Sequence, residues 1–541
     1  IEPLGAPIVT ITLPTGDVER FEVAASPRCN TYQVYKDVEL AFNPVGDTQS
    51  ELVALNDSSA RYEDGTLLEK GSFAAPVDPS RYQLTTQAGY VYTLKQDFGI
   101  EKVVDPNGNI LRYTNDGIFH SSGKAITFQR DSDGRIRAIT TPNGDVLNYQ
   151  YSDEGDLSAS ADALGNSTEY TYNRSHGLLE IIDPLGNRLV RNIYDDSGRL
   201  VAQEDSDGNR TDFNHDIEGR QSVITDRRGN STLYYYDDRG NVTAKVDAAG
   251  NSWNYSYDDR GNQLSQLDPL GNTTSATFDD RNNQLTQTDE SGNTVSYTYN
   301  TRGQELTITD ARGNLYENSY DSLGNLLTVK GPNGDVASNY INAKGLVSKT
   351  VDMDGNATSY TYDSDGNKLT ETDALGNVAR YTYDENGNVL TESLDREVSG
   401  SVISETTRYV YDANNRVVET QRADGSTVST EYDAAGNQTA MVNALGHRTE
   451  YAYDAFRRIT ETYHPDGTVD ARTYDAEGNL ATEIDRLGRI TRYTYDKLNR
   501  VIRTDFADGG HSETEYDAAG RVIRETDANG NTSAYEYDAA G

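Results

Sequence analysis

The sequence predicts an all-β protein made of tandem β-hairpin repeats, about 21 residues each, that form a spiralling sheet, shell or tube. Three observations lead to this fold class. A Tyr-Asp dipeptide returns at a nearly constant spacing, each copy opens a glycine-containing turn signal, and a second such signal divides every spacing in two. A fixed short period is typical of proteins that grow by stacking units rather than by adding separate cores.

The unit that begins at Tyr257 shows the pattern. Tyr257-Asp258 leads to Gly261, and Asp268 leads to Gly271. The same anchor recurs downstream at Phe278, Tyr299, Tyr320, Tyr362, Tyr383, Tyr432, Tyr453, Tyr474, Tyr495, Tyr516 and Tyr537, and upstream at Tyr151, Tyr172, Tyr194 and Tyr236. Degenerate copies fill the register at Arg130-Asp131, His215-Asp216 and Ile341-Asn342. The array therefore holds about twenty units.

Each unit reads as one hairpin. Asp at the first turn position accepts backbone hydrogen bonds, and Gly supplies the positive φ that tight turns require. Between the turns lie short alternating segments such as Val378-Ala-Arg-Tyr381-Thr-Tyr383, which is strand periodicity. Two turns and two strands per period give one hairpin per unit.

Tyrosine pairs of the form Tyr-x-Tyr end the second strand of many units. Residues two apart point to the same face of a strand, so we expect ladders of stacked rings, each aromatic pair adding ~0.5–1.5 kcal/mol. The pairs are Tyr255/Tyr257, Tyr297/Tyr299, Tyr360/Tyr362, Tyr381/Tyr383, Tyr451/Tyr453, Tyr493/Tyr495 and Tyr535/Tyr537. We expect first-strand aliphatic residues to line the same layer: Leu264, Leu285, Leu306, Leu327, Leu369, Leu390 and Ile502.

Irregular spacings and a non-repetitive start set the predicted domain organisation. Residues 1–98 do not follow the repeat and read as a β-rich lead-in or capping region, and residues 99–541 form the array, with degenerate units at its start. Tyr172 to Tyr194 is one residue longer than the period, which indicates a β-bulge. A turn insertion of seven residues is expected near 394–405, either as a tolerated loop or as a contact for a partner.

The composition excludes several classes of function. With 87 acidic and 48 basic residues, the net charge of −39 opposes binding to nucleic acid and to anionic membranes. The sequence contains no run of 18 apolar residues, so membrane insertion is not expected. Cys29 is the single cysteine and therefore forms no internal disulfide. The mean hydropathy of −0.75 is typical of disordered chains, but 38 tyrosines in register favour a thin folded wall.

The unit Tyr-Asp-x-x-Gly-Asn/Arg followed by Asp-x-x-Gly-Asn resembles the Rhs/YD-repeat family over about residues 90–541. That family includes bacterial polymorphic toxins, B and C subunits of insecticidal toxin complexes, wall-associated bacterial proteins and animal teneurins. The resemblance implies a spiral β-sheet wrapped into a hollow shell. In the toxins the shell encloses a C-terminal toxic domain, and in teneurins a similar shell serves cell-surface recognition. It therefore implies a secreted or bacterial cell-surface protein.

One departure from the toxin pattern matters. Toxin-bearing members close the array with an Asp-Pro-x-Gly-Leu signature whose aspartates release the toxic tail. Here Asp183-Pro-Leu-Gly186 and Asp268-Pro-Leu-Gly271 are followed by Asn187 and Asn272, so they are ordinary repeat turns. We expect the self-cleaving site and the cargo to be absent from this chain, which reads as a piece of a longer protein.

No pattern indicates catalysis, a cofactor or a metal. Asp recurs at every turn, whereas a catalytic carboxylate pair would be unique in the sequence. The segment 363–367 is similar to a calcium loop, but its Gly is misplaced and the closing Glu of an EF-hand is missing; incidental cation binding stays open. Six histidines lie in no metal-ligand spacing: His120, His176, His215, His447, His464 and His511.

The leading hypothesis is a non-enzymatic shell segment that encloses or presents a toxin or effector domain, or other parts of the same longer protein. The alternative is a cell-surface adhesion, recognition or carbohydrate-binding module, in which exposed Tyr and Asn contact glycans or receptors. Under either hypothesis we expect no catalytic, cofactor or metal residues. The structural markers of the repeat are Tyr257, Asp258, Gly261, Asp268, Gly271, Tyr297, Tyr299, Tyr381, Tyr383, Tyr493 and Tyr495.

Overall fold

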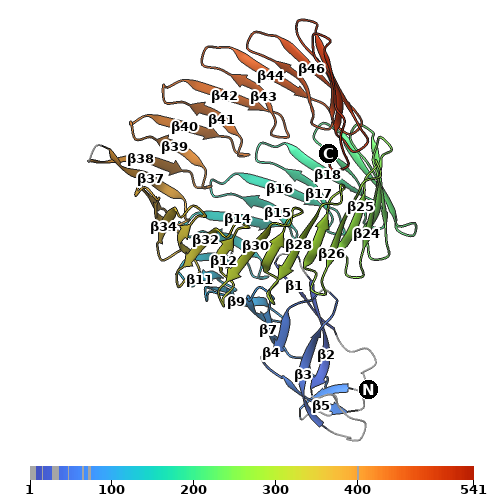
Figure 1. Ribbon diagram of the computed structural model, residues 1–541, viewed down its shortest axis with the longest axis vertical. Helices are drawn as coiled ribbons and strands as arrows, with labels where there is room; N and C mark the ends of the chain where they lie inside the picture. Colours follow the sequence, from blue (N-terminus) through green and yellow to red (C-terminus); the bar gives the residue numbers. More distant parts are fainter. Residues whose placement is uncertain are drawn as a thin grey trace. The chain divides into compact units, whose positions relative to one another are not determined.

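Every regular element of the described chain is a β-strand, which confirms the predicted fold class (Figure 1). The computed structural model describes residues 8–14, 16, 18–26, 36–46, 48–63, 66–70, 75–398 and 401–541, so Cys29 lies outside the described residues. Contacts divide the chain into two units, each treated by itself below. Unit 1 comprises Ile1–Thr127, Ala276–Gln287 and Thr294–Val378, and unit 2 comprises Phe128–Ser275, Thr288–Asn293 and Ala379–Gly541.

The lead-in contains a five-stranded antiparallel sheet in the order β1-β2-β3-β5-β6. Its strands are β1 (Ile8–Thr12), β2 (Val18–Ser26), β3 (Lys36–Pro44), β5 (Ser59–Glu63) and β6 (Thr66–Glu69). Phe21, Leu52, Tyr82 and Leu84 form the buried cluster beneath it. Because Leu52 and Leu84 belong to the neighbouring sheet, the cluster joins the five-stranded sheet to that second sheet.

A second sheet begins inside the lead-in and continues through the array. It starts with β4 (Glu51–Ala54), β7 (Arg81–Thr85), β8 (Val91–Lys95) and β9 (Gly99–Val104), paired in the order β4-β7-β8-β9. The predicted boundary between residues 98 and 99 falls in the turn between the paired strands β8 and β9. That boundary stays a prediction.

From β10 onward the strands follow one another in antiparallel hairpins. The first of them are β10 (Ile110–Thr114), β11 (Gly117–His120), β12 (Ala125–Arg130), β13 (Ile136–Thr140), β14 (Val146–Tyr151), β15 (Leu157–Ala161), β16 (Ser167–Tyr172), β17 (Leu178–Ile182), β18 (Arg188–Tyr194), β19 (Leu200–Glu204), β20 (Arg210–Asp216), β21 (Gln221–Thr225), β22 (Ser231–Tyr236), β23 (Val242–Val246), β24 (Ser252–Tyr257), β25 (Gln263–Leu267), β26 (Thr273–Phe278), β27 (Gln284–Thr288), β28 (Thr294–Tyr299), β29 (Glu305–Thr309) and β30 (Leu315–Tyr320).

The later strands are β31 (Leu326–Lys330), β32 (Val336–Ile341), β33 (Val347–Val351), β34 (Ala357–Tyr362), β35 (Lys368–Thr372), β36 (Val378–Tyr383), β37 (Val389–Val398), β38 (Ser401–Tyr411), β39 (Val417–Gln421), β40 (Thr427–Tyr432), β41 (Gln438–Val442), β42 (Arg448–Tyr453), β43 (Ile459–Tyr463), β44 (Val469–Tyr474), β45 (Leu480–Ile484), β46 (Ile490–Tyr495), β47 (Val501–Asp505), β48 (His511–Tyr516), β49 (Val522–Thr526) and β50 (Thr532–Ala534). Strands β39 to β46 lie side by side in sequence order (Figure 1). Two strands per 21 residues confirm the predicted hairpin period.

A β-bulge marks most of the tyrosine anchors, a feature the sequence did not reveal. Tyr257 pairs with Gln263 and Ser256 with Ser265, so Leu264 has no partner across the ladder. The same shift occurs at the following anchors Tyr299 and Tyr320. The predicted aliphatic layer is thus the row of bulged residues. Most of these residues are half-buried, but Leu369 and Leu390 are exposed. Bulges increase local strand twist, so their repetition makes the sheet coil.

The unit with one extra residue carries a further bulge, as predicted. Ile181 pairs with Val190 and Ile182 with Arg188, which leaves Leu189 unpaired. The strand that absorbs it, β18, has seven residues. The extra residue is therefore taken up within the sheet and the following anchor keeps its place.

The expected insertion near 394–405 lengthens a hairpin instead of forming a loop. Pairing between β37 and β38 continues from Leu394↔Glu405 to Val398↔Ser401. Residues 399 and 400 lie outside the described residues. Both strands absorb the added residues because a longer ladder satisfies their backbone groups, which an irregular loop of that length would leave to water.

The anchor tyrosines bind the backbone through their hydroxyls, and the predicted ladder of stacked rings is wrong. Equivalent tyrosines lie two strands apart, about 9.6 Å, whereas stacked rings need centroids within about 7 Å. The hydroxyl instead donates to the carbonyl 15 residues earlier, as Tyr257 Oη does to Val242 O at 2.9 Å and Tyr299 Oη to Gln284 O at 2.8 Å. A tyrosine of this kind thereby ties together the two ends of one hairpin, as Tyr257 does for β23 and β24.

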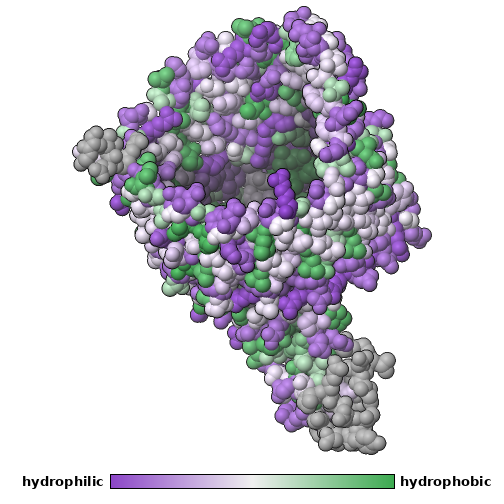
Figure 2. Space-filling view, in the orientation of Figure 1, coloured by the Kyte–Doolittle hydropathy of each residue, from purple (hydrophilic) through white to green (hydrophobic). Residues whose placement is uncertain are grey.

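The visible surface of the array is largely polar (Figure 2). Among the described residues, the largest fully buried side chains are Phe21, Leu84 and Val38, all in the lead-in. The buried apolar side chains of the array are alanines: Ala138, Ala202, Ala435 and Ala440. Hydrogen bonds between neighbouring units therefore carry much of the stability that a core supplies elsewhere.

Replacing Tyr299 by Phe should loosen one repeat without changing the fold. Loss of the hydroxyl bond to Gln284 O should cost about 1 kcal/mol, so amide hydrogen exchange in β27 and β28 should accelerate about fivefold. Tyr340→Phe is the matched control, because Tyr340 is 53% exposed and its hydroxyl makes no hydrogen bond within the described residues. Equal acceleration by both variants would contradict the role assigned to the Tyr299 hydroxyl.

Candidate functional site: the two rows of turns

The ends of the hairpins form two rows of turns, which carry most of the polar contacts of the array. The tyrosine turns follow the Tyr-Asp anchor, and the plain turns follow the first strand of each unit. In the tyrosine turn at Asp258, Oδ1 accepts from the amides of Arg260 and Asn262 (both 2.9 Å), and Oδ2 accepts from Asn262 Nδ2 at 2.9 Å. Gly261 closes the turn with φ of 90°. One carboxylate thus satisfies three donors.

The plain turn at Asp268 repeats this geometry. Its carboxylate accepts from the amides of Leu270 and Asn272 and from Asn272 Nδ2, at 2.9, 2.8 and 2.9 Å. Gly271 has φ of 89°, a conformation that other residues adopt at a steric cost. Both ends of a hairpin therefore fix its register by the same device.

Hydrogen bonding favours the ionised form of several turn carboxylates. The Asn293 amide lowers the pKa of Asp289 below its ordinary value, and the Asn377 amide does the same for Asp373. At Asp258 burial opposes ionisation, yet the donors of the turn outweigh it and the pKa is again lowered. These carboxylates are engaged as acceptors, which leaves them poorly placed for acid–base chemistry.

Arginine replaces asparagine in several tyrosine turns and adds a second contact. Arg500 Nε donates to Asp496 Oδ2 at 2.7 Å, and its guanidinium lies 4.3 Å from the ring centroid of Tyr516 in the next unit. Arg458 and Tyr474 repeat the arrangement at 4.4 Å. Stacking a cation on the ring links successive units along the row, a role that the sequence did not suggest.

Plain turns contact tyrosine turns that lie far along the chain. In unit 2, the Asn143 amide donates to Asn386 Oδ1 at 3.0 Å, and Asn143 Nδ2 donates to Asp384 Oδ2 at 3.1 Å. Asn414 repeats this one unit later, accepting from the Ala163 amide at 3.1 Å and donating to Asp162 at 2.6 Å. The separations of 241 to 252 residues show that the sheet returns on itself within the unit. We call these contacts between plain turns and distant tyrosine turns the seam.

Arg228 makes the most extensive seam contact among the described residues. Its guanidinium donates to Asn499 Oδ1 at 2.8 Å and to the carbonyls of Asp496 at 2.9 Å and Tyr495 at 3.3 Å. Asp475 lies 3.8 Å from the same group. A single plain turn thus holds two successive tyrosine turns.

Unit 1 contains its own seam of the same kind. Asn325 Nδ2 donates to Asn107 Oδ1 at 2.9 Å, and Lys124 Nζ lies 3.2 Å from Asp365 Oδ2. In both contacts an early turn meets a tyrosine turn more than 200 residues later. The seam therefore belongs to the repeat and not to one part of the chain.

The remaining sequence markers lie on the strands between the rows. Tyr297 pairs with Ile308 and Tyr493 with Thr504, while Tyr495 Oη donates to Leu480 O at 2.9 Å. Tyr381 and Tyr383 occupy the same positions at the end of β36. The structure therefore distributes the markers along the wall and gathers none of them into a cleft. Their assignment as structural markers stays a prediction.

The described residues contain no cluster of three or more His, Cys, Asp or Glu side chains that could hold a metal ion. Four histidines have close polar side-chain partners: His120 with Ser122, His176 with Asp156, His215 with Ser222, and His464 with Asp470. Across the described chain, no helical segment has the length and apolarity to cross a membrane.

The RHS repeat pattern matches residues 151–188, 194–231, 236–273, 278–315, 342–378, 362–397, 432–469, 474–511 and 516–541. The matches cover more than half of the chain. The chain belongs to the RHS repeat family. No curated protein matches this RHS repeat chain by sequence.

The RHS repeat array has the fold of a solved toxin-complex structure. TcdB2-TccC3-TEV matches 98% of this chain at 14% identity with a TM-score of 0.51. TcdB2-TccC3 without its hypervariable C-terminal region matches 96% at 12% identity and a TM-score of 0.46. The Tc holotoxin pore of Photorhabdus luminescens matches 94% at 12% identity and a TM-score of 0.43. The chain spans 35%, 35% and 30% of these structures, about a third of each.

Replacing Arg228 by Ala should open the seam of the RHS array locally. Loss of its hydrogen bonds should destabilise the turn pair by about 1–3 kcal/mol, so hydrogen exchange should accelerate in residues 226–230 and 496–500 together. Arg312→Ala is the control, because Arg312 occupies the same turn position and its guanidinium makes no hydrogen bond or ion pair to another turn within the described residues. Acceleration in residues 226–230 alone would contradict a seam contact.

The RHS array should lose stability in acid. Because the folded pKa of turn aspartates such as Asp289, Asp310 and Asp352 is lowered, their stabilisation is present above the pKa of the unfolded chain and lost as pH falls through the folded pKa. The urea midpoint should therefore hold between about pH 7 and 5 and fall below about pH 4. A midpoint that rises on acidification below pH ~4 would contradict this account.

Proposed function

We propose that this chain is a non-catalytic shell segment of a secreted or cell-surface protein. Its wall encloses or presents a toxin or effector domain supplied outside these residues, or other parts of the same longer protein. The carrying observation is the seam: plain turns bind tyrosine turns 241 to 252 residues later, so successive layers of the sheet are joined edge to edge. A wall without open edges between layers excludes proteases and unfolded partners.

The chemistry of the residues supports a passive role. The aspartates that could act as acids or bases recur in every unit, and those of the turns are held by backbone amides and asparagine side chains. Catalysis needs a unique group placed beside a substrate, and repetition works against that. The RHS repeat family and the fold shared with TcdB2-TccC3-TEV support the same proposal.

A second candidate is recognition of glycans at a cell surface. It is favoured by a cleft of about 440 Å³ in unit 2 that is lined by Tyr234, Trp253, Asn230 and Asn499. Aromatic faces and amides of this kind suit sugars. However, Lys245 lies 5.2 Å from the Trp253 ring and covers one face of it, so the shell remains the first proposal.

A low-resolution electron cryomicroscopy map of the whole 541-residue chain tests the shell. The expected density is a wall one sheet thick around a solvent-filled space, because the array buries few large side chains. A solid particle, or an open ribbon whose layers are not in contact, would overturn the proposal. Trypsin digestion of the same sample is the companion measurement, and cuts should concentrate outside the paired strands.

A further inference from the structure

One strand edge of the lead-in has no partner strand in the part of the chain that the structure describes. Within the described residues β1 (Ile8–Thr12) pairs with β2 alone. At the opposite edge of the sheet, the Glu69 amide donates to Ala75 O at 2.9 Å and the Val77 amide donates to Leu67 O at 3.0 Å, so residues 75–77 cover β6. Edge strands are usually protected by Lys, Pro or a bulge. The sequence Ile-Val-Thr-Ile-Thr of β1 contains none of these.

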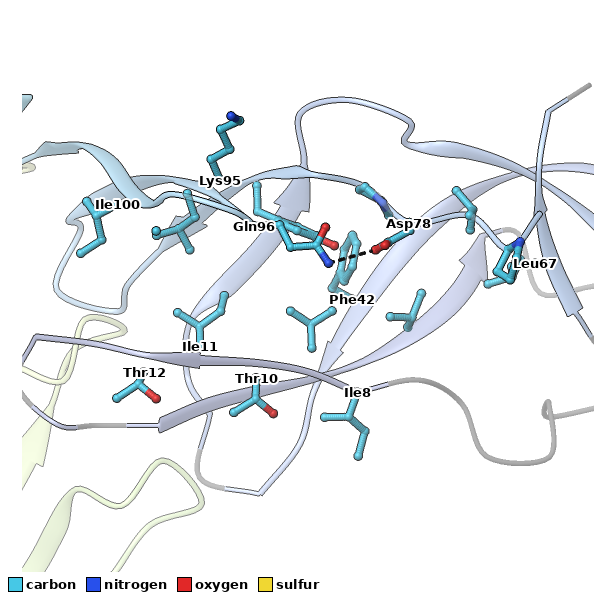
Figure 3. A pocket seen from close by; sticks show the side chains of 18 of the residues that line it. Ile8, Thr10, Ile11, Thr12, Phe42, Leu67, Asp78, Lys95, Gln96 and Ile100 are labelled. Atoms are coloured by element: carbon cyan, nitrogen blue, oxygen red, sulfur yellow. Dashed lines mark hydrogen bonds between the residues drawn. The ribbon is translucent and has the colours of Figure 1, made fainter. Parts of the chain in front are cut away.

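A cavity of about 730 Å³ runs along this edge (Figure 3). Ile11 points from β1 toward Phe42, whereas Thr10 and Thr12 lie on the other face of the strand (Figure 3). Residues of both faces line the cavity, which places it along the edge, where the unpaired amides and carbonyls lie. The volume is within the range of ligand sites, about 300–1,000 Å³.

The far wall of the groove has apolar side chains on both sides of a short polar stretch. The apolar residues are Leu67, Val77, Leu94 and Ile100, and the polar ones are Asp78, Lys95 and Gln96 (Figure 3). An occupant must therefore offer backbone donors and acceptors on one side and apolar side chains on the other. An extended strand meets both demands, because its side chains alternate while its amides form a ladder.

We propose that this groove binds an extended strand of a partner protein, which pairs with β1 and directs every second side chain, apolar in character, toward Phe42 and Ile100. The inference stands on the lead-in and is independent of the proposed shell function. Strand binding in the groove would occur even if the array enclosed no other domain.

Charge favours a neutral or basic partner over a second copy of this chain. The net charge is −39, so two copies would repel each other. Two ionic groups line the groove. Lys95 lies 3.0 Å from Asp97, whereas the partner of the Asp78 carboxylate is the neutral Gln96 amide, at 3.5 Å. The Asp78 carboxylate therefore keeps its negative charge, and both the groove and the surrounding molecule favour a cationic occupant.

Binding of a synthetic strand tests the proposal. The probe is fluorescein-labelled acetyl-Lys-Val-Thr-Val-Thr-Val-Thr-Lys-amide, titrated with the whole chain and followed by fluorescence anisotropy. Two further probes carry N-methyl groups on all Val or on all Thr nitrogens, which face opposite edges of a strand. One methylated probe should bind like the parent and the other about tenfold or more weakly, since it loses the ladder with β1. Equal binding by both, or no binding of the parent, overturns the proposal.

Two protein variants locate the site. Ile8→Lys places a cation at the rim of the groove, where Ile8 is 57% exposed. It should weaken the binding of the cationic parent probe about tenfold. Val18→Lys is the control, because Val18 is 45% exposed on β2 and does not line the groove. Equal effects of the two variants overturn the proposal. So does a dimer that the probe dissociates, because it would identify a second copy as the occupant.

Discussion

The aspartate at the first position of each turn is the interaction on which the rest of the structure depends. A hairpin alone is marginal in water, and a slip of one residue would turn every side chain to the wrong face. The Asp258 carboxylate prevents the slip because it holds two amides and one side chain of its own turn. With both ends of each hairpin fixed in this way, Tyr257 and its equivalents reach the carbonyls that close their units. The same donors surround many of the negative charges, which lets a chain of −39 fold.

Stability is organised differently in the lead-in and in the array. The lead-in has a small core around Phe21 and Leu84, as an ordinary domain does. The array has no such core within the described residues, and each unit relies on the hydrogen bonds and half-buried side chains of its neighbours. Arg500, which joins the carboxylate of its own turn to the ring of Tyr516, shows how a substitution in the turn consensus strengthens that dependence. A unit of the array is therefore stable because of the contacts that its neighbours make with it.

The turns, the strands and the coiling of the sheet could be predicted from the sequence, whereas the pairing of particular residues across strands and between distant turns could not. Asp268 and Gly271 predict a turn because of their own chemistry. The alternation of residue types through Tyr381 and Tyr383 predicts a strand. The bulge at Leu264 escaped prediction because it follows from how two strands pair, which a single period does not encode. The seam between Asn143 and Asn386 depends on small twists summed over more than ten units. The groove beside β1 depends on packing between two sheets that share no motif.

The seam also explains why the two irregular units leave the array intact. Leu189 is absorbed by a bulge inside a strand, so the turns on either side keep their order in the rows. The long β37–β38 hairpin occupies the position of a plain turn, and it extends beyond that row without displacing the tyrosine turns at Asp384 and Asp412. Those two turns still bind Asn143 and Asp162 through Asn386 and Asn414. A wall joined through its turns therefore tolerates added length in the plain row and within strands, but a change in the tyrosine row would shift the contacts of every later layer.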